Sequence, residues 1–123
     1  CTCDVWDTTL MLRAFGDHPI FARDAAPRAL RFLLDVQNPD GGWGFRPAVE
    51  SDNDSTSCVL LALREHDDDA QLQTVERGIA YLLGNQREDG LWNTWQAAED
   101  HPVEDCVAQE SAASAASLSA SRA

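Results

Sequence analysis

The chain has 123 residues and a mass of 13.5 kDa, and 44% of its residues are apolar, which suffices for one core but not for two. Its 21 acidic residues against 9 Lys and Arg give a formal charge of −12, which repels phosphate backbones and argues against a nucleic acid partner. No apolar run approaches the roughly 20 residues that span a bilayer, so we expect a cytoplasmic protein.

The sequence predicts helices and no strands, because no run alternates apolar and polar residues for long. In chain order, the predicted helices cover residues 8–15, 27–37, 55–65, 70–85 and a segment from 105 onward. Asp7, Asp54 and Asp105 each precede a helix, where a carboxylate is a good N-cap. The segment 17–26 is expected to be a loop. The third helix is apolar on most of its circumference and should be buried, whereas the fourth is amphipathic and should lie outside it.

One pattern occurs twice at a fixed spacing of 49 residues, in 28–43 and again in 77–92. Each copy holds an Arg, an apolar helical run, a Gln, a turn with Asp and Gly, and a Trp. The recurring Gln and Trp are Gln37 and Trp43 in the first copy and Gln86 and Trp92 in the second. A repeat of this length indicates helical units that bury their apolar faces by stacking. We assign these four side chains to stability, and the alternation of buried and amphipathic helices predicts a double-layered helical toroid.

The cysteines do not indicate a metal site. Cys1, Cys3, Cys58 and Cys106 lack the spacing of zinc ligands and have no clustered histidine partner. Cys58 and Cys106 lie in apolar helical contexts and are interpreted as small buried side chains. The predicted domain covers 1–110, and an Ala- and Ser-rich tail follows it at 111–123.

Four landmarks, in the right order, resemble the triterpene cyclases, specifically squalene-hopene cyclase and its class II terpene cyclase relatives. The two repeats resemble the Gln-Trp motif of that family. Residues 52–56, Asp-Asn-Asp-Ser-Thr, resemble its acid motif Asp-x-Asp-Asp-Thr. Residues 5–8 resemble its Val-Trp-Asp-Thr segment, and 104–109 resemble Glu-Asp-Val-Thr-Ala-His. The resemblance implies an all-α fold, an α/α toroid of which five helices form about half of one domain.

The resemblance also implies a class II reaction, in which a Brønsted acid protonates a linear polyprenoid and starts its cyclisation. The implied acid is Asp54, and Asp52 lies two residues away, so that mutual repulsion favours keeping one carboxyl protonated. Ser55 stands where the family has a second Asp, and Gln109 stands where hopene cyclases have a His. Both can form hydrogen bonds to the acid, but neither supplies a positive charge. Asp105, from the downstream segment, completes the implied catalytic set.

Aromatic side chains are the expected lining of the cavity. Trp6, Phe45 and Trp95 resemble family positions that face the substrate, where a desolvated aromatic ring stabilises a cation by about 2 kcal/mol or more. Ordinary core packing is the alternative for all three. The resemblance implies no cofactor, although a diphosphate substrate would bring Mg²⁺. It also implies a polyprenoid substrate, membrane association through regions that the chain lacks, and either an oligomer or a missing complementary half.

Other interpretations remain open. A non-catalytic α/α toroid, serving as a scaffold for a partner or a hydrophobic ligand, is favoured by Ser55 and Gln109. Kinship with protein prenyltransferase β subunits is a third interpretation, but no zinc-ligand set of Asp, Cys and His is evident. For Asp54 the N-cap role competes with the acid role, because a capping carboxylate is favoured when it is ionised.

Overall fold

The computed structural model describes residues 2–66 and 71–93. Within these ranges it contains helices and one isolated bridge but no strand, which confirms the predicted all-α fold. The helices are α1 (Asp4–Phe15), α2 (Pro19–Arg23), α3 (Ala25–Asp35), α4 (Asn53–Glu65) and α5 (Leu72–Gly84). The helix predicted from residue 105 and the tail at 111–123 lie outside the described residues.

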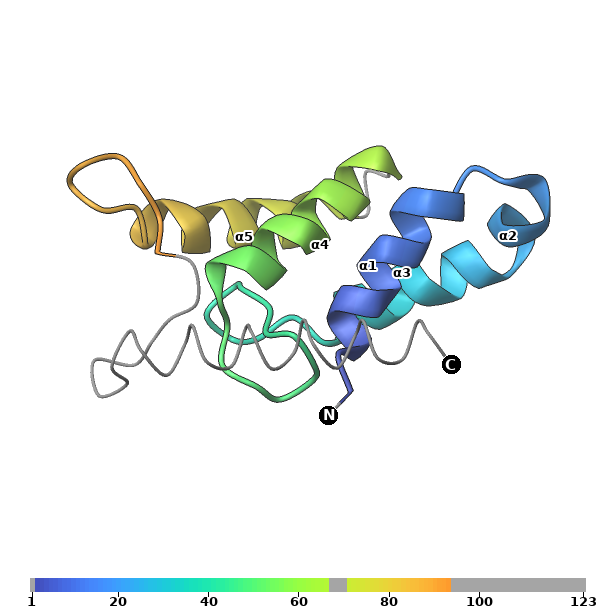
Figure 1. Cartoon of the computed structure of the whole chain (residues 1–123), viewed down its shortest axis with the longest axis horizontal. Helices are drawn as coiled ribbons and strands as arrows, with labels where there is room; N and C mark the ends of the chain where they lie inside the picture. The colour runs from blue at the N-terminus through green and yellow to red at the C-terminus, as the bar shows by residue number, and fades with distance from the viewer. Residues whose placement is uncertain (1, 67–70, 94–123) are drawn as a thin grey trace, which may run out of the picture.

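Helix α4 lies between α1 and α5, and α1 also packs against α3 (Figure 1). As predicted, α4 is more buried than α5. Several residues of α4 are buried, whereas Gly78 is the only buried residue of α5. A long loop joins α3 to α4 and turns back on itself, since Asp52 N–H donates to Trp43 O at 3.0 Å. This loop delivers the acid motif to the start of α4.

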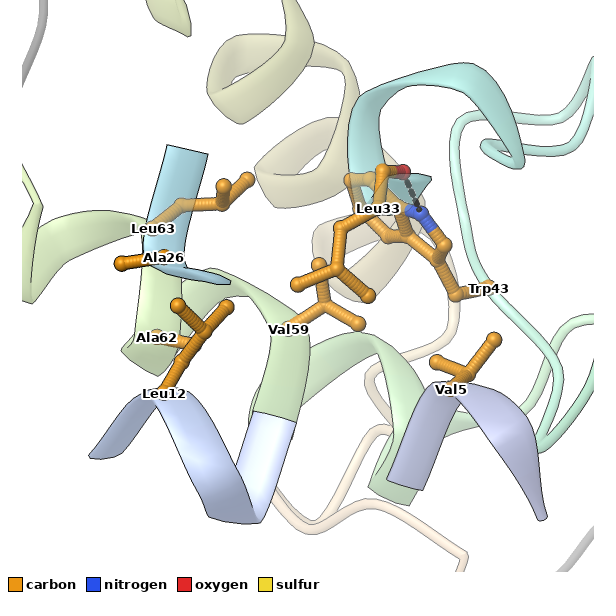
Figure 2. Packing of buried hydrophobic residues seen from close by; sticks show 8 residues of the cluster. All are labelled: Val5, Leu12, Ala26, Leu33, Trp43, Val59, Ala62 and Leu63. Carbon is orange, nitrogen blue, oxygen red and sulfur yellow. Dashed lines mark hydrogen bonds between the residues drawn. The ribbon is translucent and has the colours of Figure 1, made fainter. Parts of the chain in front are cut away.

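The core is formed where α1, α3 and α4 meet the loop after α3. Its buried apolar side chains are Val5, Leu12, Ala26, Leu33, Trp43, Val59, Ala62 and Leu63 (Figure 2). Trp43 is completely buried, and its indole N–H donates to Leu33 O at 2.8 Å. Because the polar atom of the ring has a partner, the full area of the indole is buried without a desolvated donor.

Helix α1 begins one turn earlier than the sequence predicts, and Asp7 is not its N-cap. The helix starts at Asp4 after Cys3, which makes no side-chain cap bond. Val5 explains the extra turn, because it is buried and its N–H donates to Phe45 O at 3.1 Å. Asp7 lies in the first turn, where its charge still favours the positive end of the helix.

The segment predicted to be a loop at 17–26 contains α2, so that prediction is wrong. His18 begins this short helix by accepting the Ile20 N–H on Nδ1 at 3.3 Å, and Pro19 occupies the first helical position. Helix α3 then follows almost at once. It begins and ends two residues before the predicted range.

Each of the two copies of the repeat ends in a turn, and the same hydrogen bonds stabilise both turns. We call residues 37–43 turn 1 and residues 86–92 turn 2. The Gln side chain donates to the Gly carbonyl four residues ahead, at 2.9 Å in turn 1 and 2.8 Å in turn 2. The Trp indole donates to a carbonyl ten residues back, at 2.8 Å and 2.6 Å. These bonds agree with the structural role predicted for the repeated Gln and Trp.

Candidate functional site

The acid motif is organised around Asp52, which is the N-cap of α4. Asp52 Oδ1 accepts the Ser55 N–H at 2.6 Å, and Asp52 Oδ2 accepts the Ser55 hydroxyl at 2.8 Å. The extended backbone of Asp52, with φ −130° and ψ 160°, suits a cap, whereas Asn53 and Asp54 are already helical. The prediction that Asp54 caps this helix is therefore wrong.

Ser55 joins the motif to α1. Its side chain is completely buried, and its Oγ accepts the indole N–H of Trp6 at 3.0 Å while donating to Asp52. Three of the predicted site residues, Trp6, Ser55 and Asp52, thus form one hydrogen-bonded chain across two helices. A hydroxyl is suited to this position because it can donate and accept at the same time.

The two carboxyl groups of the motif influence each other. Burial raises the pKa of Asp52 above its ordinary value of 3.8; the hydrogen bonds from Ser55 oppose this, and the negative charge of Asp54 adds to it. Asp54 itself lies in the first turn of α4 and is half-buried. Asp52 is thus fixed by hydrogen bonds, and Asp54 lies close enough for the charges of the two groups to interact.

Sequence reasoning placed Asn53 and Thr56 in the motif but assigned neither of them a role. Asn53 is 5% exposed, and its amide donates to Asn93 O at 3.0 Å, which ties the motif to the segment after turn 2. Among the described residues its Oδ1 has no hydrogen-bond partner. Thr56 is completely buried, and its Oγ1 accepts the backbone N–H of Trp43 at 2.9 Å. Both lie within the acid motif, so their polarity inside a buried helix was the available signal.

Of the aromatic residues predicted to line a cavity, two are described. Trp6 is half-buried and adjoins the acid motif through Ser55. Phe45 is also half-buried, and the guanidinium carbon of Arg46 lies 5.5 Å from its ring centroid. Trp95 and the predicted catalytic residues Asp105 and Gln109 lie outside the described residues.

Residues 2–66 and 71–93 contain neither a cluster of metal ligands nor a membrane-spanning helix. No group of three or more His, Cys, Asp or Glu side chains gathers there as a metal site. Cys3 and Cys58 are free thiols; Cys58 is half-buried, and burial raises its pKa. None of the helices in these ranges has the length and apolar character needed to cross a membrane.

Comparison with known proteins identifies the family. The squalene-hopene cyclase C-terminal domain family matches residues 2–104. The chain is 33% identical to sporulenol synthase of Bacillus subtilis (strain 168) over 132 aligned positions, covering 94% of this chain and 20% of the relative. It is 32% identical to squalene–hopene cyclase of Bradyrhizobium diazoefficiens over 116 positions, covering 75% of this chain and 17% of the relative.

A relative with a different name also matches. Drimenyl diphosphate synthase of Streptomyces showdoensis is 41% identical over 77 positions, covering 63% of this chain and 14% of the relative. No solved structure matches the chain. The chain thus spans a fifth or less of the length of these relatives. The family match over most of its residues shows that the chain belongs to the squalene-hopene cyclase C-terminal domain family and is part of a class II terpene cyclase domain of the α/α-toroid class.

Proposed function

We propose that this chain carries the acid site of a class II terpene cyclase, which protonates a linear polyprenoid and so begins its cyclisation. The observation that carries the proposal is the chain of hydrogen bonds from Trp6 through Ser55 to Asp52. It holds the acid motif at the start of α4 and anchors an aromatic ring beside it. The names of the relatives support the same class of reaction.

In this proposal the two carboxyl groups have separate roles. Asp52 is the cap, so its oxygens are occupied by Ser55, whose hydrogen bonds favour the ionised form and oppose the effect of burial. Asp54 is relieved of the capping role that would compete with proton donation. This division leaves Asp54, in the first turn of α4, as the carboxyl group available for proton donation.

Asp54 is the proposed proton donor. Its carboxyl O–H transfers the proton to a terminal alkene carbon or an epoxide oxygen, which leaves a carboxylate on Asp54 and a carbocation on the substrate. In an alkene the π electrons form the new C–H bond; in an epoxide an oxygen lone pair forms the new O–H bond and a C–O bond breaks. Later double bonds of the polyprenoid then attack the cation in turn. Loss of a proton from the final cation restores neutrality.

Trp6 is the proposed cation-stabilising residue of the described part of the site. The indole N–H is held by Ser55, so the ring has a fixed orientation and its polar atom is not directed at the substrate. An aromatic face stabilises a nearby cation without acting as a nucleophile. Phe45 and Trp95 are proposed to extend the same lining.

Turnover of the 123-residue chain tests this proposal. The chain would be incubated with squalene and, in the presence of Mg²⁺, with farnesyl diphosphate, and the products would be separated by gas chromatography with mass detection, after phosphatase treatment for the diphosphate. We expect cyclised product from the parent and a loss of about 100-fold or more for Asp54→Asn, as is typical when a general acid is removed. Asp7→Asn, which changes a first-turn Asp of α1, is the matched control and should retain activity.

The non-catalytic scaffold is the competing function, and the position of Ser55 favours it. This side chain is completely buried and joins α1 to α4, so the motif serves a structural role whatever its chemistry. Helical, folded samples of the parent and of Asp7→Asn that both give no product would overturn the cyclase proposal for this chain and support the scaffold.

A further inference from the structure

The indole of Trp6 is connected to a carboxyl group through one intervening hydroxyl. Its N–H donates to Ser55 Oγ at 3.0 Å, and that hydroxyl donates to Asp52 Oδ2 at 2.8 Å. We call these three side chains the hydrogen-bond relay. The relay joins the first turn of α1 to the N-cap of α4, and Ser55, its middle member, is completely buried.

The direction of both hydrogen bonds follows from the chemistry of the three groups. An indole N–H can only donate, so Ser55 Oγ must be the acceptor in its bond with Trp6. The single hydroxyl hydrogen of Ser55 is then left for Asp52, whose ionised oxygens can only accept. The two bonds thus point the same way, from the indole toward the carboxylate, and in such a series each bond polarises the next.

The buried position of Ser55 strengthens the effect of Asp52 on the indole. Charges and hydrogen bonds interact more strongly in the protein interior than in water, because the effective dielectric constant is lower. Asp52 is also fixed by a second bond, in which its Oδ1 accepts the Ser55 N–H at 2.6 Å. The carboxylate is therefore held against the hydroxyl, and its charge acts on the indole N–H along a defined path.

Trp43 and Trp92 show that holding an indole in place does not require such a relay. Their indole N–H groups donate to Leu33 O at 2.8 Å and to Leu82 O at 2.6 Å, both of which are neutral backbone carbonyls. Among the three tryptophans that the structure describes, the one bonded toward a carboxyl group is thus the one beside the acid motif. Trp6 is half-buried, so part of it remains accessible.

We propose that the hydrogen-bond relay transmits the negative charge of Asp52 to the Trp6 indole and so raises the electron density of its ring. Ionised Asp52 attracts the hydroxyl hydrogen of Ser55, which makes Ser55 Oγ a stronger acceptor for the indole N–H. Electron density shifts into the ring, while every proton stays on its own atom. Because an electron-rich ring attracts a cation more strongly, the relay increases the stabilisation of the carbocation in the proposed function, on which this inference rests.

In this scheme Ser55 and Asp52 are positioning residues, because both act on the substrate cation through Trp6. Asp52 thereby has a second role besides capping α4. A relay with only a structural role would hold the ring but would leave its electron density independent of the charge on Asp52. The two alternatives therefore differ in whether the indole responds when Asp52 ionises.

Nuclear magnetic resonance of the isotopically labelled full chain tests the proposal through the indole N–H signals, each assigned by replacing one Trp with Phe. Spectra would be recorded from about pH 7 to about pH 4, where carboxyl groups begin to bind protons. The pKa of Asp52 is raised above 3.8, mainly by burial, so its titration begins within this range. We expect the Trp6 N–H signal to move downfield as Asp52 ionises, because a stronger hydrogen bond deshields the donor proton. The signals of Trp43 and Trp92 should not follow it.

Three variants identify the source of this movement. Asp52→Asn should abolish it, because Asn preserves the cap but carries no charge. Ser55→Ala should also abolish it, although Asp52 can still titrate. Asp54→Asn is the matched control, because it removes the neighbouring carboxyl group and leaves the relay intact, so Trp6 should still respond. If circular dichroism shows that Ser55→Ala has lost helix, Ser55→Cys replaces it, because a thiol is a weak donor and acceptor and should reduce the movement.

Other charged and titratable groups lie on the elements packed around the relay and can act on the indole through space. They are Asp54 and Cys58 on α4, Asp4, Asp7 and Arg13 on α1, Asp40, Arg46 and Glu50 in the segment before α4, and Arg77 on α5. The carboxyl groups among them titrate in the same range as Asp52. Their combined effect is the movement that remains in Asp52→Asn, and it is subtracted from that of the parent.

The proposal is overturned if the Trp6 signal does not move with pH, or if it moves equally in the parent and in Asp52→Asn. It is also overturned if the folded Ser55 variant moves as the parent does, because the charge would then act through space. None of these results depends on turnover. A responsive Trp6 signal in a chain that gives no cyclised product would support the relay and overturn the cyclase proposal, so the two failures are distinguishable.

Discussion

Trp43 and Trp92 donate the same indole hydrogen bond to a carbonyl ten residues back, yet Trp43 is completely buried and Trp92 is 42% exposed. The local geometry of the turn is therefore independent of what covers it. Helices α4 and α5 both cover turn 1, where Thr56 of α4 accepts the Trp43 backbone N–H and Gly78 of α5 lies close to the Trp43 ring. This separation of local and tertiary contributions makes the two turns a matched pair for measurement.

We expect Trp43→Phe to lower the free energy of unfolding by about 1 to 3 kcal/mol, because it leaves Leu33 O buried without its donor. Trp92→Phe should cost less than about 1 kcal/mol, because Leu82 O can be hydrated. Trp92→Phe should still lower the melting temperature measurably, and its effect on the pattern of any products should be the smaller of the two effects. Urea unfolding of dilute samples measures both losses, and equal losses would contradict the assigned difference in burial.

The stability of the parent relative to Asp52→Asn should depend on pH. The pKa of Asp52 is raised in the folded chain, mainly by burial, so the folded state binds more protons than the unfolded state just above pH 3.8. The stability of the parent relative to the variant should therefore fall as pH rises through this window and level off above the folded-state pKa. Asn preserves the cap, which isolates the effect of charge.

Urea unfolding of both proteins at a series of pH values from about 3 to about 7 tests this prediction. Subtracting the variant from the parent removes the contributions of groups that the two share. A difference that rises with pH would show that the hydrogen bonds from Ser55 outweigh burial.

Gly41→Ala should be more destabilising than Gly90→Ala. Both glycines have positive φ, 91° and 83°, so any side chain in this region costs about 1 to 2 kcal/mol of backbone strain. At Gly41 the new Cβ would also lie 2.5 Å from Arg77 O, which forces α5 to move, whereas at Gly90 its nearest neighbour is 3.9 Å away. Thermal unfolding of the two variants measures the difference, and equal melting temperatures would show that α5 does not press on turn 1.

Arg77→Ala should lower the free energy of unfolding by about 0.5 to 1.5 kcal/mol, because it removes three hydrogen bonds between α5 and turn 1. Arg28→Ala should change it by less than about 0.5 kcal/mol in dilute solution, because Arg28 makes an exposed ion pair with Asp24. The two positions are equivalent in the repeat, so the effect on helix propensity is the same. A loss for Arg28→Ala as large as that for Arg77→Ala, in samples shown to be monomeric, would contradict this assignment.

The sequence was sufficient to predict features that depend on short stretches of chain. The Gln and Trp of each turn form their internal bonds within ten residues, and the repeat displays both copies of the pattern. The choice between Asp52 and Asp54 as N-cap was not predictable in this way. Both precede the apolar run, and the bridge from Asp52 to Trp43 fixes the extended backbone that selects Asp52.

The start of α1 has a similar cause. Its extra turn depends on Val5, whose N–H is bound by Phe45 O, forty residues away in sequence. The contact between Trp6 and Ser55 is also long-range. Resemblance to the family named both residues, but only the folded chain shows that one donates to the other.

The hydrogen bonds described for the two turns also bear on the order of folding. Those within turn 1 join residues four and ten apart, whereas the bond from Gln37 to Thr74 spans 37 residues and that from Trp6 to Ser55 spans 49. Closing a short loop costs less chain entropy than closing a long one. Each turn can therefore form with the helix that precedes it before the two repeats pack together. The rate-limiting step should then be the docking of α4 and α5 onto α3 and turn 1, which already have their final shape.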